Sequence, residues 1–307
     1  MKGLDLASVT EIAVRTSEPP RLHVRQRLRE LWASRQILAN LVRKEIKVKY
    51  KSSVLGAAWS MLNPVLYLAV FSLVFSIFLQ AKTPHFPVYL LSGLLAWNLF
   101  STSLGLATRS VVDNANLVTK VYFPREILPL ASVGAAGVDF LLQALVLLGF
   151  MAGTRFFHLG VNLLLLPLAM LALVVFTSAM GLWVSALNVR YRDTQHLLGL
   201  ALLTWFWLTP VIYPSGFVFQ RFADNHFLGI PMFDIYLANP MVGVIAGFHR
   251  ALYAVVRPDA GADPVLLPVS VAWLAILLAA VTVGSLVLLF LAWRTFFRLS
   301  GDFAEEL

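Results

Sequence analysis

Six long apolar segments constrain this sequence of 307 residues more than any other feature. They cover about residues 57–79, 88–107, 127–153, 161–187, 197–213 and 267–293. A helix of about 20 apolar residues is long enough to cross a bilayer. Only 13% of the residues are charged, against about 25% in soluble domains. We therefore predict an all-α integral membrane protein with six transmembrane helices, which excludes an ordinary cytosolic enzyme and a disordered chain.

Positive charge is concentrated before the first apolar segment. Residues 1–56 hold 12 of the 24 Lys and Arg but only 5 of the 16 Asp and Glu. Beside a bilayer, such a block favours binding to anionic headgroups, and no nucleic-acid partner is expected. Residues 25–51 have apolar positions at helical spacing, which predicts an amphipathic interface helix. Its polar side carries Arg43, Lys44, Lys47 and Lys51.

The remaining charges predict an orientation and a domain organisation. With the N-terminus inside, the inner segments hold 19 Lys and Arg and the outer segments hold 5. The positive-inside rule then places both termini in the cytoplasm. Residues 214–266 are outside yet rich in apolar residues, which predicts re-entrant helices between spans five and six. Residues 1–24 are expected to be a flexible lead, and residues 25–307 a single transmembrane domain.

Catalytic and metal-binding motifs are absent from the sequence. It has no G-x-x-x-x-G-K-[ST], no H-E-x-x-H, no G-x-S-x-G and no cysteine. Its six histidines are scattered, and none forms an i,i+4 pair. We therefore expect no enzyme, no bound metal and no cofactor in this chain.

Three groups of motifs carry a resemblance to a known family. They are residues 41–51 with 54–64, residues 114–129, and residues 187–193 with 208–214 and 239–241. This pattern resembles the permease subunit of ABC-2 type exporters of cell-surface polysaccharide, which include O-antigen and teichoic-acid exporters. The resemblance implies a homodimer in the cytoplasmic (inner) membrane, with two copies of a separate ATPase that binds ATP and Mg. It also implies a cargo of polysaccharide linked to a polyprenyl-diphosphate lipid.

Two other functions stay open at this point. The first is an ABC-2 exporter of a small molecule or drug. The second is a membrane-embedded enzyme of glycan assembly, because Asp224, His226 and Asp234 lie near one another in a single outside loop.

The loop between the second and third spans is the candidate contact with an ATPase. Asp113 or Asn114 can cap a short helix there, and Pro124 can end it. A short capped helix with apolar side chains suits docking in a partner's cleft, whereas the alternative is a plain solvated loop. With the resemblance, the ATPase-coupling candidates are Asn114, Asn116, Leu117, Val118, Lys120, Tyr122, Phe123 and Arg125.

Aromatic side chains are the candidates for the substrate pathway. They are Tyr67, Phe71, Phe75 and Phe78 in the first span, and Trp205, Phe206 and Trp207 in the fifth. The first four share one helical face, and aromatic faces stack on sugar rings without selecting any one sugar. The alternative is a lipid-facing or packed core position.

Asp139 is the one carboxylate well inside an apolar segment. Because a charge in lipid is costly, its side chain should face protein or water. This leaves a cavity or dimer-contact role, or a local hydrogen bond to a neighbouring helix.

Single cysteines at Ser8, Thr83 and Asp259 test the predicted orientation, since the sequence has no cysteine of its own. We expect an impermeant thiol reagent to label Thr83→Cys and Asp259→Cys in intact cells and to leave Ser8→Cys unlabelled. Labelling of Ser8→Cys without labelling of Thr83→Cys would contradict the predicted orientation and indicate the opposite one.

Overall fold

A computed structural model describes residues 24–51, 53, 55–56, 58–74, 83–157, 160–222, 225–257 and 263–307. In chain order the elements are α1 (Val24–Ala33), α2 (Arg35–Tyr50), α3 (Ala58–Ser72), α4 (Phe86–Ser110), η3 (Val112–Asn114), α5 (Ala115–Lys120), α6 (Ile127–Thr154), η4 (Val161–Leu164), α7 (Leu165–Arg190), α8 (Thr194–Trp207), α9 (Ser215–Phe222), β1 (His226–Phe227), β2 (Ile230–Pro231), α10 (Met232–Leu237), α11 (Pro240–Phe248), η5 (His249–Tyr253), α12 (Val271–Leu299) and α13 (Phe303–Glu306). The described part of the chain is thus mostly helical, as predicted, with one short β-hairpin.

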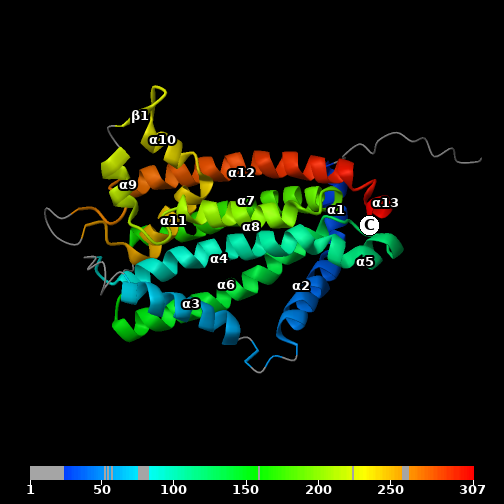
Figure 1. The fold of residues 1–307 in the computed structure, drawn as a ribbon, viewed down its shortest axis with the longest axis horizontal. Coiled ribbons are helices and arrows are strands. Elements are labelled where there is room, and N and C mark those ends of the chain that lie inside the picture. The colour runs from blue at the N-terminus through cyan, green and yellow to red at the C-terminus, as the bar shows by residue number, and fades with distance from the viewer. Residues whose placement is uncertain are drawn as a thin grey trace, which may run out of the picture.

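Four long apolar helices form the body of the molecule. They are α4, α6, α7 with the preceding η4, and α12, and within the described residues these four are long and apolar enough to cross a membrane. Figure 1 shows them running along the long axis, with α12 packed on α7, and α4 on α6 and α7. Most of α4 is buried, whereas only 22% of the most apolar stretch of α12 is buried. A helix that is apolar all round is expected either in a core or against lipid, and α4 and α12 show the two cases.

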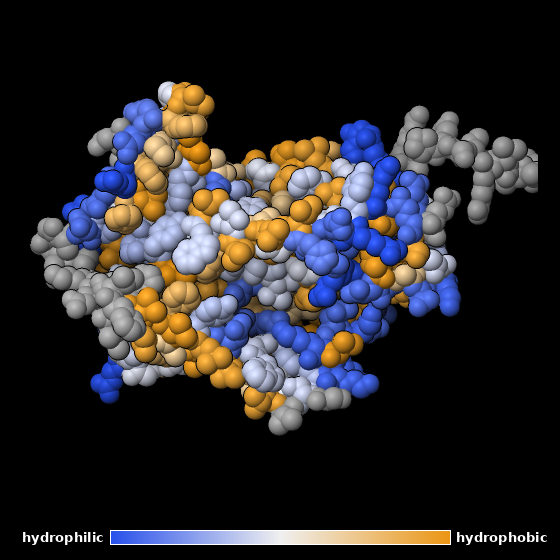
Figure 2. Space-filling view, viewed as in Figure 1, coloured by the Kyte–Doolittle hydropathy of each residue, from blue (hydrophilic) through white to orange (hydrophobic). Residues whose placement is uncertain are grey.

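The two ends of the bundle differ in composition. One end carries α1, α2, α5 and α13, and Figure 2 shows hydrophilic side chains gathered there. We call this the basic end. The opposite end carries α9, the β1–β2 hairpin, α10 and α11, and we call it the loop end.

The helices in the predicted first and fifth spans are short. The helix α3 covers Ala58–Ser72, and residues 75–82 lie outside the described residues. The helix α8 covers 14 residues and ends before Thr209 and Pro210. The residue before a proline disfavours helical backbone, which explains this end. Six spans are therefore not confirmed; the structure supports four.

The prediction of one continuous interface helix over residues 25–51 is wrong, because two helices cover this segment. The chain leaves helical geometry at Ser34, which separates α1 from α2. Of the predicted lead at 1–24, only Val24 lies within the described residues.

The loop end contains a buried helix. Asn239 caps α11 by accepting a hydrogen bond from the Met241 amide at 3.1 Å, and Pro240 occupies the first turn. Every residue from Met241 to Phe248 is buried, and α11 packs against α4, α7 and α12.

Close approach at Gly93 joins α4 to the loop end. A Cβ atom at this position would lie 2.6 Å from His249 Nε2 and 3.0 Å from the Val211 carbonyl oxygen. His249 is fully buried and stacks on Tyr89 with ring centroids 4.1 Å apart. Both neighbours are themselves completely buried.

We therefore expect Gly93→Ala to lower the thermal unfolding midpoint of the purified protein, because overpacking a core costs about 1–3 kcal/mol. The control is Gly105→Ala in the same helix, where a Cβ would meet nothing within 4 Å. Equal midpoints for the two variants would contradict this packing.

Candidate functional site

A buried carboxylate at the start of α6 joins three helices at the basic end. Glu126 is 1% exposed. Arg27 of α1 donates from Nε and Nη2 to its two carboxylate oxygens, at 3.0 and 3.1 Å. Trp293 of α12 donates from its indole nitrogen to the same carboxylate at 3.1 Å. A bidentate pair of this kind fixes orientation as well as distance, so α1, α6 and α12 are held together at this point.

The acidic neighbours of Arg27 also determine its pKa. Burial alone would lower the pKa of Arg27, but the hydrogen bonds and attraction from Glu126 and Glu30 outweigh burial and raise it. The pKa of Glu30 is lowered, mainly by its hydrogen bond from Arg27. The pKa of Arg125 is lowered by burial and by repulsion from Arg27. These shifts favour the ionised forms of both Arg27 and Glu30.

A second carboxylate further along α6 binds α2 and α3. Asp139 is 6% exposed. It accepts hydrogen bonds from Lys49 Nζ at 2.6 Å, Tyr50 Oη at 2.7 Å and Ser60 Oγ at 2.9 Å. The carboxylate is thus paired and fully hydrogen-bonded, as a buried charge must be. The same side chain also lines a pocket of about 370 Å³ between α2, α4 and α6.

The predicted coupling residues divide into a buried and an exposed set. Val118 and Phe123 lie in a hydrophobic cluster with Leu41 and Phe296. Asn114 is buried, and it accepts a hydrogen bond from Lys44 Nζ at 2.5 Å. Its predicted capping role is wrong, because neither it nor Asp113 makes a side-chain cap at α5 or η3. These buried side chains connect the coupling loop to α2 and α12.

The exposed set is the surface that a partner could contact directly. Tyr122 is 97% exposed, and Asn116 and Lys120 are exposed beside it. Leu117 is half-buried against the same hydrophobic cluster. Arg125 donates a hydrogen bond to the Ser300 carbonyl, which links the loop to the chain between α12 and α13.

The basic side chains predicted on the interface helix lie on the surface of α2 and just after it. Arg43, Lys44, Lys47 and Lys51 are all exposed. The opposite side of α2 packs on α6, where Leu41 is buried and Val42 contacts Gly134.

The pathway candidates of the first span are described in part. Tyr67 is 40% exposed and stacks on Phe71, with ring centroids 6.0 Å apart. The two rings therefore share one face of α3. Phe75 and Phe78 lie outside the described residues.

The candidates on α8 have three different environments. Trp205 packs edge-on against Phe100 and donates to Asn239 Oδ1 at 2.8 Å. Phe206 contacts Trp97, with ring centroids 5.4 Å apart. Trp207 is 59% exposed. Trp205 and Phe206 thus support the packing of α8, and Trp207 faces outward.

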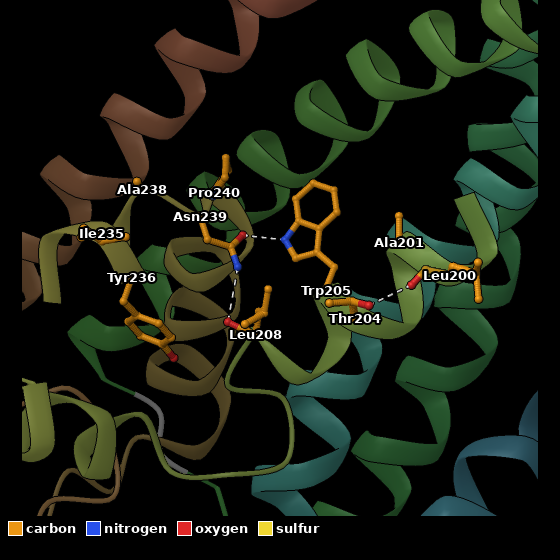
Figure 3. Close-up of a pocket in the computed structure, with 10 residues that line it drawn as sticks. All are labelled: Leu200, Ala201, Thr204, Trp205, Leu208, Ile235, Tyr236, Ala238, Asn239 and Pro240. Atoms are coloured by element: carbon orange, nitrogen blue, oxygen red, sulfur yellow. Dashed lines mark hydrogen bonds between the residues drawn. The ribbon is translucent and has the colours of Figure 1, made fainter. Parts of the chain in front are cut away.

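A pocket of about 810 Å³ lies between α8 and the loop end. Figure 3 shows Trp205 directed toward Asn239, which joins the two walls of the pocket, and Tyr236 on the loop-end side. The lining residues are Leu200, Ala201, Thr204, Trp205, Leu208, Ile235, Tyr236, Ala238, Asn239 and Pro240. The lining is largely apolar with a few polar groups, as in sites that bind organic ligands.

Comparison with known proteins gives the family. The sequence profile described as ABC-2 type transporter matches residues 36–233, well over half of the chain. This chain belongs to the ABC-2 type transporter family. It is a multi-pass membrane subunit of a transporter.

Several relatives share this sequence at moderate identity. The O-antigen export system permease protein RfbA of Myxococcus xanthus is 33% identical over 283 residues, which cover 91% of this chain and 98% of the relative. A protein of the same name from Klebsiella pneumoniae is 31% identical over 61% of this chain and 72% of its own length. The polysialic acid transport protein KpsM of Escherichia coli is 24% identical over 66% of this chain and 75% of its own length.

Sequence reasoning missed the side chains that hold the basic end together. Glu126 directly precedes an apolar segment, which is a signal that could have marked it. Its partner Arg27 is 99 positions away, and Lys49 is 90 positions from Asp139. No local pattern predicts pairs at such separations.

We expect Arg27→Leu to destabilise the basic end, because it leaves the Glu126 carboxylate buried and without its cation. Breaking a buried pair in this way costs about 3–5 kcal/mol. The thermal midpoint should fall, and trypsin should cut the α1–α2 region faster. The control Arg29→Leu removes an exposed arginine of the same helix and should change neither measurement. A Glu126→Leu change added to Arg27→Leu should recover stability; no recovery would contradict the pairing.

Proposed function

We propose that this chain is the permease subunit of an ABC exporter that moves polysaccharide linked to a polyprenyl-diphosphate lipid across the cytoplasmic membrane. The observation that carries this is its likeness to an O-antigen export permease, over 98% of that protein's length. A second relative is named for polysialic acid transport, which favours polysaccharide over a small-molecule cargo. Separate ATPase subunits would bind ATP and Mg and supply the energy.

The proposed contact with the ATPase is the exposed edge of the coupling loop, at Asn116, Lys120 and Tyr122. The loop is attached to α2 through the Lys44–Asn114 hydrogen bond. Its C-terminal end leads directly into α6 at Glu126, the carboxylate that binds Arg27 and Trp293. A force applied at Tyr122 would therefore reach α1, α2, α6 and α12 together, since these elements are joined by buried contacts.

The proposed topology has six crossings and two cytoplasmic termini. The helices α3 and α8 lie at the predicted first and fifth spans and are proposed as the two crossings beyond the four long helices. The buried helix α11 is proposed to be re-entrant, because its capped start and full burial satisfy the backbone inside protein. We further propose one transmembrane domain per chain and a dimer of two copies.

The proposed path for the polysaccharide through the protein is lined by many weak, similar contacts instead of a few strong ones. A polymer that slides cannot be held by specific hydrogen bonds that must break at each step. The stacked Tyr67–Phe71 pair and the exposed Trp207 supply aromatic faces of the required kind. The 810 Å³ pocket beside Trp205 adds an apolar recess on the same helix as Trp207.

The function is tested in cells that lack their own O-antigen export permease. The chain, supplied with its ATPase, should restore surface glycan. We expect Lys120→Ala with Tyr122→Ala to weaken ATPase association about tenfold or more, as loss of an exposed aromatic anchor does, and surface glycan should fall in parallel.

The matched control is Phe217→Ala, which removes an exposed aromatic side chain at the opposite end and should leave both measurements unchanged. Unchanged ATPase binding in the double variant would refute the contact surface. Failure of the wild-type chain to restore surface glycan, with the ATPase bound, would refute the proposal that the cargo is a polysaccharide.

A further inference from the structure

The β1–β2 hairpin at the loop end has an unusual residue in its turn. Phe227 pairs with Ile230, so the turn between the strands consists of Leu228 and Gly229. Both have positive φ, 53° and 80°. This is the pattern of a tight hairpin turn that normally selects Asn, Asp or Gly at its first position. A leucine there is sterically disfavoured, so the turn geometry does not explain its presence.

The tip of this hairpin is apolar and has little cover. Phe227 is 58% exposed, Leu228 88% and Ile230 52%. Figure 2 shows hydrophobic surface at the end of this projection. Two exposed polar residues, Arg221 and His226, lie toward its base. The hairpin is thus apolar at the tip and polar behind it.

The hairpin tip lies beside the part of α12 that is expected at the boundary between hydrocarbon and headgroups. Figure 1 shows the hairpin projecting from the bundle at the top of the view, above the first turns of α12. The helix α12 has 29 residues and is about 43 Å long, which exceeds the roughly 30 Å of hydrocarbon. This excess length allows its first turns to reach the headgroup region. Trp273, 38% exposed in the first turn, is the residue type that collects at this boundary.

We propose that the tip formed by Phe227, Leu228 and Ile230 inserts into the interfacial layer of the bilayer beside α12. The direction favours lipid over a second copy, because the tip extends past a helix whose own exposed side chains are apolar, such as Ile276 and Val283. Arg221 and His226, which are exposed nearer the base of the hairpin, would then meet the polar headgroups. An apolar tip with polar flanks is the arrangement that binds a membrane interface.

Insertion of the tip would fix one wall of the 810 Å³ pocket. The helix α10 begins directly after β2, and its residues Ile235 and Tyr236 line that pocket. The hairpin would thus hold α10 at a set depth relative to the bilayer. This inference depends on the chain spanning a membrane and not on the identity of the cargo.

The experiment uses the full chain in lipid bilayer discs, with one nitroxide label on a cysteine introduced at Ile230. The sequence contains no cysteine, so the label has a single site. The measured quantity is the ratio of collisions with oxygen, which dissolves in lipid, to collisions with a water-soluble nickel chelate. A label at Asn225, an exposed polar residue at the hairpin base, is the control. We expect a ratio several-fold higher for Ile230→Cys than for Asn225→Cys.

A second variant separates insertion from folding of the hairpin. Leu228→Asn keeps the turn, since Asn accepts positive φ readily, but removes the apolar side chain. It should lower the ratio at Ile230→Cys toward that of the control. An equal ratio at the two labels, a label that neither reagent reaches because protein covers it, or an unchanged ratio in Leu228→Asn would each overturn the proposal.

Discussion

The basic end depends on two ion pairs, in which Arg27 binds the buried carboxylate of Glu126 and Lys49 binds that of Asp139. Glu126 and Asp139 are about 20 Å apart along the helix, and each is almost fully removed from solvent. A buried charge without a partner is strongly destabilising, so Arg27 and Lys49 must reach these two points. That requirement holds α2 along α6 and attaches α1 to the start of α6.

This arrangement gives the amphipathic segment two tasks. Arg43, Lys44, Lys47 and Lys51 stay exposed, while Arg27, Lys49 and Tyr50 attach the segment to the helical bundle. The coupling loop joins the same assembly through Asn114 and the buried Val118. A partner bound at Tyr122 would therefore act on a rigid unit made of α1, α2, α5 and the ends of α6 and α12.

The candidate site shows where local reasoning is sufficient and where it is not. The sequence predicts a short helix between residues 113 and 125, and the structure places α5 there. The sequence did not indicate which side chains of that helix turn inward. Val118 looks like a docking residue in isolation, but its side chain fills a cluster built from α2, α6, α7 and α12. The break at Ser34 was likewise invisible, because α1 and α2 have a continuous helical pattern.

Apolar length and the distribution of charge along the chain are enough to predict a helical membrane protein with a basic N-terminal segment. The ordered motifs of the sequence were also enough to indicate the family. Which charges pair is visible only in the folded chain, since the partners are 99 and 90 positions apart. The tertiary structure also decided which aromatics pack and which face outward, and that the Leu228 side chain is almost fully exposed at the hairpin turn. These outcomes depend on contacts between distant segments, which local composition and periodicity do not encode.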